Sequence, residues 1–486
     1  MKKWICLFLA LLTLCGCTAK SESAQTDSTT LPSQTEPAAE AVETQPPETE
    51  APWSPYTGTS KGYVYCYPEG RDRDWEEDVI YVGDNYLKNF HALTHFPSRI
   101  QMIGDVEYTD EFYDPDLRQS FIDQLNELIL QIPQLSDTEI LYELQRILAL
   151  LKDVHTGIDL PTEDLFPIGF EVFFENDELV YRVTYLPSKY EYAMFARLVG
   201  INNIPLDEII ERMKPYLPHE NQYCLAYMLS GNGYPGWLSC RDLLLITGVI
   251  DDPDDAVRYN LQYFGGVPET IKLKSVNTEE FATFRASGWT HAMAYPDIYG
   301  ESDTQFYFYK MMPEADMLYV RFNEFSPMPE YPILNFGNDI LREVRDTGGV
   351  DKLVVDLRRN PGGAQTLGFP EFITILKRLD VDQIYVLTDQ GTFSCAIIMA
   401  SQIKQAIPEV ILMGTPAGQA PNFYAGLYEN DYTMPNSGIT CNIPTAYYRM
   451  IPDYAHEALM PDIPVYPTLE DYAEGIDTVL EAVKKH

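Results

Sequence analysis

The sequence predicts an α/β protein built around a parallel sheet. Three short apolar segments typical of buried strands, 353–356, 384–389 and 409–414, follow one another in the C-terminal half. A glycine-rich turn ends the first of them, and residues 395–405, between the second and the third, suit a buried helix. Strands that alternate with helices form a parallel sheet, and the loops at the carboxyl ends of its strands are available for chemistry.

The N-terminus is typical of an exported protein. Two lysines precede an apolar run over residues 4–15, which is too short for a permanent membrane-spanning helix and suits a secretory signal. The run ends in Leu-Cys-Gly-Cys at 14–17, which resembles the bacterial lipobox, and this resemblance implies a signal peptide over 1–17 with lipid attached to Cys17. A plain signal peptide is the alternative. No other segment approaches 18 consecutive apolar residues, so we expect a lipid anchor on the extracytoplasmic face of the cell membrane.

Residues 18–52 predict a disordered, acidic stalk. They are mostly Ser, Thr, Pro, Ala, Gln and Glu, with seven acidic residues, one lysine and no aromatic residue. Such a segment cannot bury enough apolar surface to offset its chain entropy.

The remaining chain of about 430 residues exceeds one ordinary core and predicts two or three packed units. The formal net charge of −39 argues against nucleic acid and against adsorption to anionic lipid. An odd number of cysteines after the signal, with no C-x-x-C spacing, gives neither a disulfide framework nor a metal site. We therefore expect no cofactor and no metal, and membrane contact through the anchor alone.

A helical segment is predicted over 53–165. Between 116 and 151 lie two helical patterns broken near Pro133, and the second opens with the capping box Ser136-Asp137-Thr138-Glu139. The helix then leads into a polar loop that contains a lone histidine, His155.

A different unit is predicted over 166–275. Residues 167–174 and 179–183 pair as a hairpin. Residues 198–206, followed by a helical stretch at 207–213, resemble the strand-turn-helix of a PDZ-like module, which would bind an extended C-terminal peptide by strand addition. A family-specific α+β insert is the alternative.

Ser394 lies where the second predicted strand passes into a helix N-terminus, a place that favours negative charge. There a serine can attack a carbonyl whose oxyanion is held by the N–H of Cys395. Gly362 and Gly363, which lack side chains, can bring a second N–H to the same oxygen. The plainer alternative is that Ser394 is an N-cap and the glycines form an ordinary turn.

Three segments carry a family resemblance: Val-Asp-Leu-Arg-Arg-Asn-Pro-Gly-Gly at 355–363, Thr-Phe-Ser-Cys-Ala at 392–396 and Gly-Thr-Pro-Ala-Gly at 414–418. Together they resemble the tail-specific (C-terminal processing) serine peptidases, in particular the branch of the tricorn core and the retinoid-binding-protein-like forms. The resemblance implies a sheet-helix catalytic domain akin to the crotonase and ClpP group over 276–486, with Ser394 as nucleophile. The pattern over 469–484 predicts a terminal helix.

One family residue is missing. The processing peptidases use a lysine as general base on the loop that here spans 414–422, near Gln419 or Ala420, and this chain has none there. Lys404 lies ten residues along the helix that follows Ser394, hence about 15 Å away. The sequence thus excludes a serine-lysine dyad of the usual kind.

A histidine can take the place of that lysine. Asp-Val-His-Thr at 153–156 resembles the D-x-H-[ST] element of tricorn-type relatives, and this resemblance implies that His155 is the general base. An imidazole with a pKa near 6.5 can accept the serine proton at neutral pH. Asp453 and Glu457 lie where those relatives supply an acid, but no motif matches there residue for residue, and polar residues of a loop are the favoured interpretation.

Two functions follow. The first is a secreted, lipid-anchored serine peptidase that hydrolyses peptide or protein substrates through an acyl-enzyme at Ser394. The alternative is an inactive pseudopeptidase that binds peptides or other ligands at the cell surface. The retained motifs favour the first function, and the missing lysine favours the second.

Overall fold

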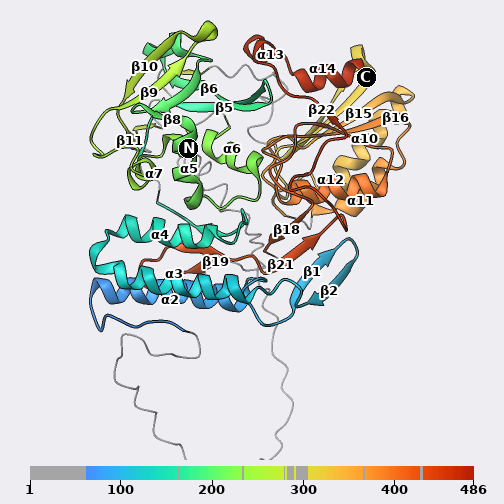
Figure 1. The fold of residues 1–486 in the computed structure, drawn as a ribbon. Coiled ribbons are helices and arrows are strands. Elements are labelled where there is room, and N and C mark those ends of the chain that lie inside the picture. The colour runs from blue at the N-terminus through green and yellow to red at the C-terminus, as the bar shows by residue number, and fades with distance from the viewer. Residues whose placement is uncertain are drawn as a thin grey trace, which may run out of the picture.

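The computed structural model describes residues 62–161, 164–232, 235–277, 280–281, 289–291, 305–364, 367–426 and 431–486 (Figure 1). The predicted signal peptide, the lipidation residue Cys17 and the predicted stalk lie outside the described residues. Among the described residues, no helix combines the length and the apolar character that a membrane crossing requires.

The predicted parallel sheet is present, and the mixed α/β class is confirmed. Four neighbouring strands run parallel, an antiparallel strand pairs at one edge, and a short parallel strand closes the other. In spatial order the strands are β13 (Tyr307–Met312), β14 (Met317–Phe322), β15 (Val350–Asp356), β16 (Val381–Thr388), β17 (Ile411–Gly414) and β22 (Ile463–Pro464).

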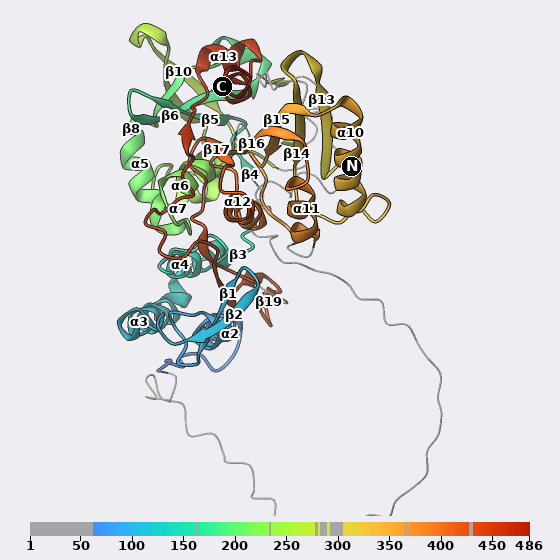
Figure 2. The ribbon, with the colours of Figure 1, turned by 90° about the vertical axis from the view of Figure 1, so that its right-hand side faces the viewer.

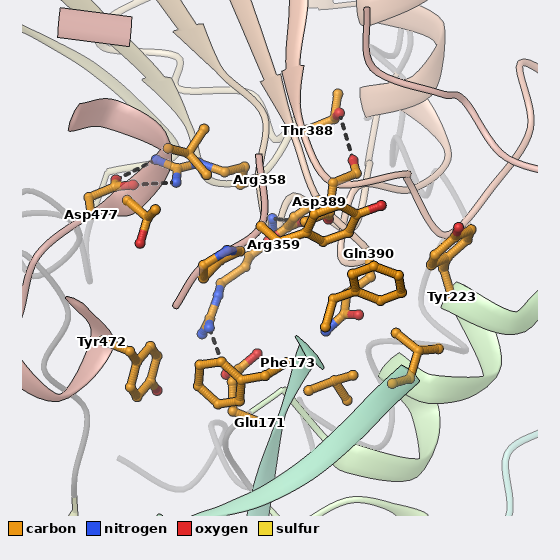
Figure 3. Close-up of a pocket in the computed structure, with 18 of the residues that line it drawn as sticks. Glu171, Phe173, Tyr223, Arg358, Arg359, Thr388, Asp389, Gln390, Tyr472 and Asp477 are labelled. Atoms are coloured by element: carbon orange, nitrogen blue, oxygen red, sulfur yellow. Dashed lines mark hydrogen bonds and ion pairs between the residues drawn. The ribbon is translucent and has the colours of Figure 1, made fainter. Parts of the chain in front are cut away.

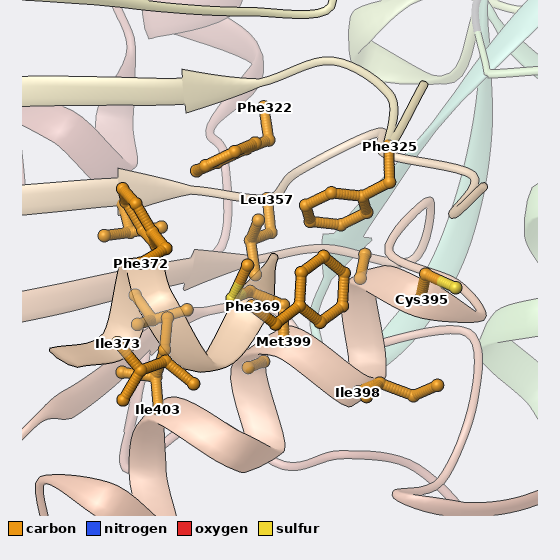
Figure 4. Packing of buried hydrophobic residues seen from close by; sticks show 14 of the residues in the cluster. Phe322, Phe325, Leu357, Phe369, Phe372, Ile373, Cys395, Ile398, Met399 and Ile403 are labelled. Carbon is orange, nitrogen blue, oxygen red and sulfur yellow. The ribbon is translucent and has the colours of Figure 1, made fainter. Parts of the chain in front are cut away.

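Both faces of this sheet are covered, because successive residues of each strand point to opposite sides. Leu353 and Val355 of β15 pack in the core that contains α10 (Ile333–Thr347), α11 (Phe369–Leu376) and α12 (Cys395–Ala406). Figure 4 shows aromatic side chains filling the space between these helices and the strands. Val354, between those two residues, packs on the other face with side chains of the C-terminal helix α14 (Thr478–Lys485).

The C-terminus differs from the sequence expectation. The pattern over 469–484 suggested one helix, but the chain forms α13 (Leu469–Glu474) and then α14. Gly475 separates them with a left-handed conformation at φ 75°, which ends the first helix, and Asp477 caps the second by accepting from the N–H of Leu480.

The insert has its own sheet and core. The predicted hairpin is confirmed as β5 (Gly169–Glu175) and β6 (Glu178–Pro187), joined by Asn176 and Asp177, both with positive φ. Its identity as a PDZ-like domain stays a prediction. The other strands of the sheet are β7 (Arg197–Ile201), β8 (Ile204–Pro205), β9 (Val257–Gln262), β10 (Pro268–Leu273) and β12 (Trp289–His291), and the helices are α5 (Leu206–Met213), α6 (Gln222–Ser230) and α7 (Arg241–Ile246).

The N-terminal helices α2 (Arg71–Asn89), α3 (Pro115–Gln131) and α4 (Asp137–Ala149) pack side by side at the bottom of Figure 1. The predicted capping box opens α4: Ser136 and Glu139 each bond the backbone N–H of the other. The predicted break before α4 is also present, as a short 3-10 turn at Ile132–Gln134 that contains Pro133.

A segment distant in sequence returns to these helices. β18 (Asn422–Ala425) and β21 (Ala446–Arg449) join the hairpin of β1 (Ser98–Met102) and β2 (Asp105–Thr109) in one sheet. Similarly, β20 (Thr440–Asn442) pairs with β3 (Gly157–Ile158), directly after His155, and with β19 (Asp431–Thr433). These pairings bring the loop after α4 beside the chain that follows β17, which is the region of the predicted site (Figure 2).

Candidate active site

Ser394 is held at the N-cap of α12 by a structured turn. The Asp389 carboxylate accepts from the backbone N–H groups of Arg359 (2.8 Å) and Gly391 (2.9 Å), and Phe393 N–H donates to Asn360 O (3.0 Å). Ser394 itself has φ 51° and ψ −121°, a conformation that side-chain-bearing residues rarely adopt. Such backbone strain concentrates at functional sites.

The glycine turn lies directly against this serine. Gly362 has φ 106°, and a Cβ there would stand 2.6 Å from Ser394 Cβ and 3.1 Å from Ser394 Oγ. Only glycine allows this approach. The N–H of Gly362 already donates to Asn360 Oδ1 (2.8 Å), and the Cys395 thiol donates to Gly363 O (2.8 Å). Of the predicted oxyanion donors, the N–H group of Gly362 is therefore already used within the turn.

A buried ion network fixes the strand end that precedes this turn. Asp356 contacts Arg321 (2.9 Å) and Arg358 (2.6 Å), and accepts from Tyr319 Oη (2.7 Å). Burial acts to raise the pKa of Asp356, but the two guanidinium groups outweigh it and lower this pKa to about 2. Arg358 also contacts Asp477 (2.7 Å), so the network ties the turn to α14.

Gln419, near the position at which the processing peptidases carry a lysine, contacts both the nucleophile and the predicted base. Ser394 N–H donates to Gln419 Oε1 (2.6 Å), and Gln419 Nε2 donates to Glu220 Oε1 (2.6 Å) and lies 3.4 Å from His155 Nδ1. Gln419 is completely buried. The structure thus brings Ser394 and His155 to opposite ends of one carboxamide, although 239 residues separate them in the chain.

The orientation of this carboxamide follows from its partners. A backbone N–H can only donate, so the oxygen of Gln419 faces Ser394 and the NH₂ group faces Glu220 and His155. In this arrangement His155 Nδ1 accepts a hydrogen bond, and a neutral ring carries its proton on Nε2. A base that acts through Nε2 needs the other tautomer, with the proton on Nδ1 and an acceptor facing it.

Asp153 is the acceptor available for that tautomer. Its Oδ1 lies 3.8 Å from His155 Nδ1, and its Oδ2 accepts from Thr156 Oγ1 (2.7 Å). The ring of His155 also stacks on Phe423, with centroids 5.7 Å apart and planes 14° apart. Both His155 and Asp153 are buried. The D-x-H-[ST] segment therefore contributes a carboxylate as well as the imidazole.

Glu220 is a site residue that the sequence analysis missed. It lies between two insert helices with no motif around it, and only the fold brings it to His155 and Asp153. Burial and the charge of Asp153 raise the pKa of Glu220, Gln419 and His155 act in the opposite direction, and the net result is a pKa of about 8. The predicted acids Asp453 and Glu457 have exposed side chains. The acids that the structure places beside the imidazole are thus Asp153 and Glu220.

A pocket that is partly open to solvent adjoins the turn that carries Ser394, but neither Ser394 nor His155 is among the residues that line it. Figure 3 shows Glu171 of the insert in an ion pair with Arg359 (2.8 Å), which stands on the opposite wall. Phe173, Tyr223 and Tyr472 add aromatic surface. Apolar walls with a few convergent polar groups are typical of ligand-binding sites.

Comparison with known proteins gives a local match in sequence and a broad match in fold. No family model matches the chain. A segment of 116 residues is 28% identical to the carboxyl-terminal-processing protease of Picosynechococcus sp. (strain ATCC 27264 / PCC 7002 / PR-6) and covers 23% of this chain and 25% of that protein. The chain therefore matches about a quarter of the length of this curated relative.

The similarity in fold extends much further. Mature CPAF in complex with lactacystin aligns with a TM-score of 0.55 and 12% identity, over 85% of this chain and 98% of that chain. A crystal structure of mature CPAF aligns with a TM-score of 0.53 and 12% identity, over 85% of this chain and 97% of that chain. The local sequence match is thus to a carboxyl-terminal-processing protease, as the motifs around Ser394 predicted, and the fold as a whole is similar to that of mature CPAF.

Proposed function

We propose that this protein is a serine-type peptidase that hydrolyses peptide bonds through an acyl-enzyme at Ser394. The observation that carries the proposal is the hydrogen-bonded connection from Ser394 through Gln419 to His155. In support of the proposal, a strained serine and an imidazole both contact this one carboxamide, and a carboxylate lies 3.8 Å from the imidazole. The segment similar to a carboxyl-terminal-processing protease supports the same activity.

In the proposed reaction, Ser394 Oγ attacks the peptide carbonyl carbon and its proton passes to His155. The N–H groups of Gly363 and Cys395 hold the oxyanion. His155 then gives the proton to the leaving amine, and water hydrolyses the acyl-enzyme by the same route. For His155 to start in the required tautomer, its ring proton is on Nδ1 instead of Nε2, with Asp153 Oδ1 as the acceptor and the Gln419 NH₂ group turned away from Nδ1.

Covalent labelling with a fluorophosphonate tests this activity. We expect wild-type protein to label between about pH 6 and 9, where a histidine base is at least partly neutral. Ser394→Ala and His155→Ala should both abolish labelling, since nucleophile and base act as one unit. Labelling that persists in His155→Ala would remove the histidine from the mechanism, and a folded wild-type protein that never labels would contradict catalysis.

The second candidate is a binding protein without turnover, and a specific contact favours it. The Gln419 NH₂ group faces His155 Nδ1 and stabilises the tautomer that cannot act as a base through Nε2. If labelling is absent, peptide binding to the folded Ser394→Ala protein would support this alternative.

We also propose, from the sequence alone, that the protein is lipid-anchored through Cys17 to the extracytoplasmic face of the cell membrane, with peptides or proteins as its substrates.

A further inference from the structure

Three side chains with metal-binding groups converge beside Ser394. Asp153, His155 and Glu220 each offer one ligand atom, and these atoms all lie within 4.8 Å of one another. Asp153 and His155 are buried, and Glu220 is partly exposed. The three residues come from the loop after α4 and from the chain just before α6.

One oxygen in this group has no hydrogen-bond donor. Asp153 Oδ2 accepts from Thr156 Oγ1, but Oδ1 is buried and has no hydrogen-bond partner among the described residues. His155 Nδ1, 3.8 Å away, is beyond hydrogen-bond distance. A buried carboxylate oxygen without a donor costs free energy, and a cation at this point would remove that cost.

We propose that Asp153, His155 and Glu220 bind one Zn²⁺ ion. An imidazole nitrogen with two carboxylate oxygens suits zinc, whereas Mg²⁺ and Ca²⁺ prefer oxygen ligands alone. Zinc bonds of about 2.0 to 2.2 Å place tetrahedral ligand atoms about 3.4 Å apart. To bind the ion, the ligand atoms, now within 4.8 Å of one another, need to move closer by about 1.4 Å at most. Three protein ligands leave the fourth tetrahedral position of the ion to a water molecule.

Gln419 competes with the ion for this place. Its NH₂ group lies 2.6 Å from Glu220 Oε1 and 3.4 Å from His155 Nδ1, so it contacts two of the three ligand side chains. A cation cannot share this space with a hydrogen-bond donor that points at the same atoms. Zinc binding therefore requires the Gln419 side chain to move away.

Zinc at this site would inhibit the peptidase, a consequence that rests on the proposed function. A neutral imidazole has one nitrogen lone pair, and a metal that takes it leaves no basic nitrogen for the serine proton. Zinc should therefore suppress fluorophosphonate labelling without occupying Ser394.

Calorimetric titration of ZnCl₂ into the folded mature protein tests the site independently of catalysis. The background carries Ser394→Ala, which removes the nucleophile but no ligand, and Cys66→Ser, which removes the partly exposed free thiol. Excess Mg²⁺ occupies weak carboxylate sites on the acidic surface. We expect one zinc ion per chain, with Asp153→Asn and Glu220→Gln each weakening the affinity by about tenfold or more.

Two further variants sharpen the test. Gln419→Ala should bind zinc more tightly because the competing NH₂ group is gone, and Asp255→Asn, an exposed acid outside the site, should bind as the background does. The absence of one-to-one binding, or equal affinity in Asp153→Asn, Glu220→Gln and the background, would overturn the zinc site. The zinc site would stand and the peptidase proposal would fail if the background protein bound one zinc ion, Asp153→Asn and Glu220→Gln lost that binding, and the wild type did not label with fluorophosphonate.

Discussion

At the scale of single residues, Gln419 decides how the site is arranged at rest. Its carboxamide accepts a hydrogen bond from Ser394 N–H and donates one to Glu220, near the position at which the processing peptidases carry a lysine. A lysine ammonium would donate to Glu220 but could not accept from Ser394 N–H. Glu220 is the other residue whose chemistry depends on this contact, since its carboxylate lies in a site that disfavours negative charge.

Glu220 should make stability depend on pH in a defined window. Its pKa rises from an ordinary 4.5 to about 8 on folding, so between these values the folded protein binds a proton that the unfolded chain has lost. The free energy of unfolding therefore falls as pH rises from about 4.5 to 8. The glutamine side chain in Glu220→Gln has no proton to lose in this range. The free energy of unfolding of Glu220→Gln minus that of wild type should therefore be larger at pH 8 than at pH 5, by about 1 kcal/mol or more after allowance for partial exposure.

Urea denaturation of both proteins across this range measures the effect. If the free energy of unfolding changed with pH in the same way for wild type and Glu220→Gln, Glu220 would have an ordinary pKa in the folded protein.

At the scale of elements, the glycine turn and α14 support the nucleophile from two directions. The turn brings backbone against the serine, and the ion network of Asp356, Arg358 and Asp477 fixes the strand end before it. The turn positions Ser394 because glycine allows close contact, whereas the network holds the strand end through ion pairs between buried charges. These two contributions respond to different substitutions.

Gly362→Ala should impair the serine while the fold survives. The added Cβ would stand 2.6 Å from Ser394 Cβ and displace it, and a misplacement of about 1 Å can reduce reactivity about a hundredfold. Gly348→Ala is the matched control, because it also has a positive φ but its Cβ meets nothing within 4 Å. The control should lose only stability, about 1 kcal/mol. Equal fluorophosphonate labelling rates in the two variants would contradict a steric role for Gly362.

Asp477→Ala should destabilise the protein by about 3 kcal/mol, because it leaves Arg358 buried with only one of its two carboxylate partners. It also removes the N-cap of α14. Glu481→Ala on the same helix removes a more exposed pair with Lys484 and should cost about 0.5 kcal/mol or less. The midpoint of urea unfolding distinguishes them, and similar losses would mean that the Arg358 pair contributes little.

At the scale of the whole molecule, the site exists only where three units meet. The loop after α4 supplies His155, the insert supplies Glu220, and the main sheet supplies Ser394 and Gln419. The strand pairing of β20 with β3 and of β21 with β1 holds the first of these against the last. A fragment that contains only residues 276–486 would therefore lack the base.

Anchoring is the prediction that concerns the intact protein in its cell. If Cys17 carries lipid, Cys17→Ala should move the protein from the membrane fraction to the medium, because removing the acyl chains removes their membrane affinity. Fractionation after a high-salt wash, with detection of the folded protein by circular dichroism, measures this shift. Recovery of the variant in washed membranes would argue against lipid attachment at Cys17.

The sequence by itself determined the elements whose signals are local. The three strands before and after Ser394, the capping box at Ser136 and the β5–β6 hairpin all follow from periodicity, caps and turn residues within a few positions. The motifs also identified Ser394, Gly362 and His155 as candidate site residues, because residue type and adjacent residues are enough to predict a role for each of them. The break at Gly475 was missed because apolar spacing continued across it.

Only the tertiary structure decided which of these groups meet. Glu220 has no motif, and Asp153 had no partner in sequence other than its neighbouring histidine, yet both lie beside the imidazole, whereas the expected acids Asp453 and Glu457 are exposed. Likewise, the sequence shows that the lysine of the processing peptidases is absent, but it does not show that Gln419 forms hydrogen bonds with Ser394 N–H and Glu220. Contacts between residues 199 or more positions apart depend on how strands pair and units pack, and no local pattern encodes that geometry.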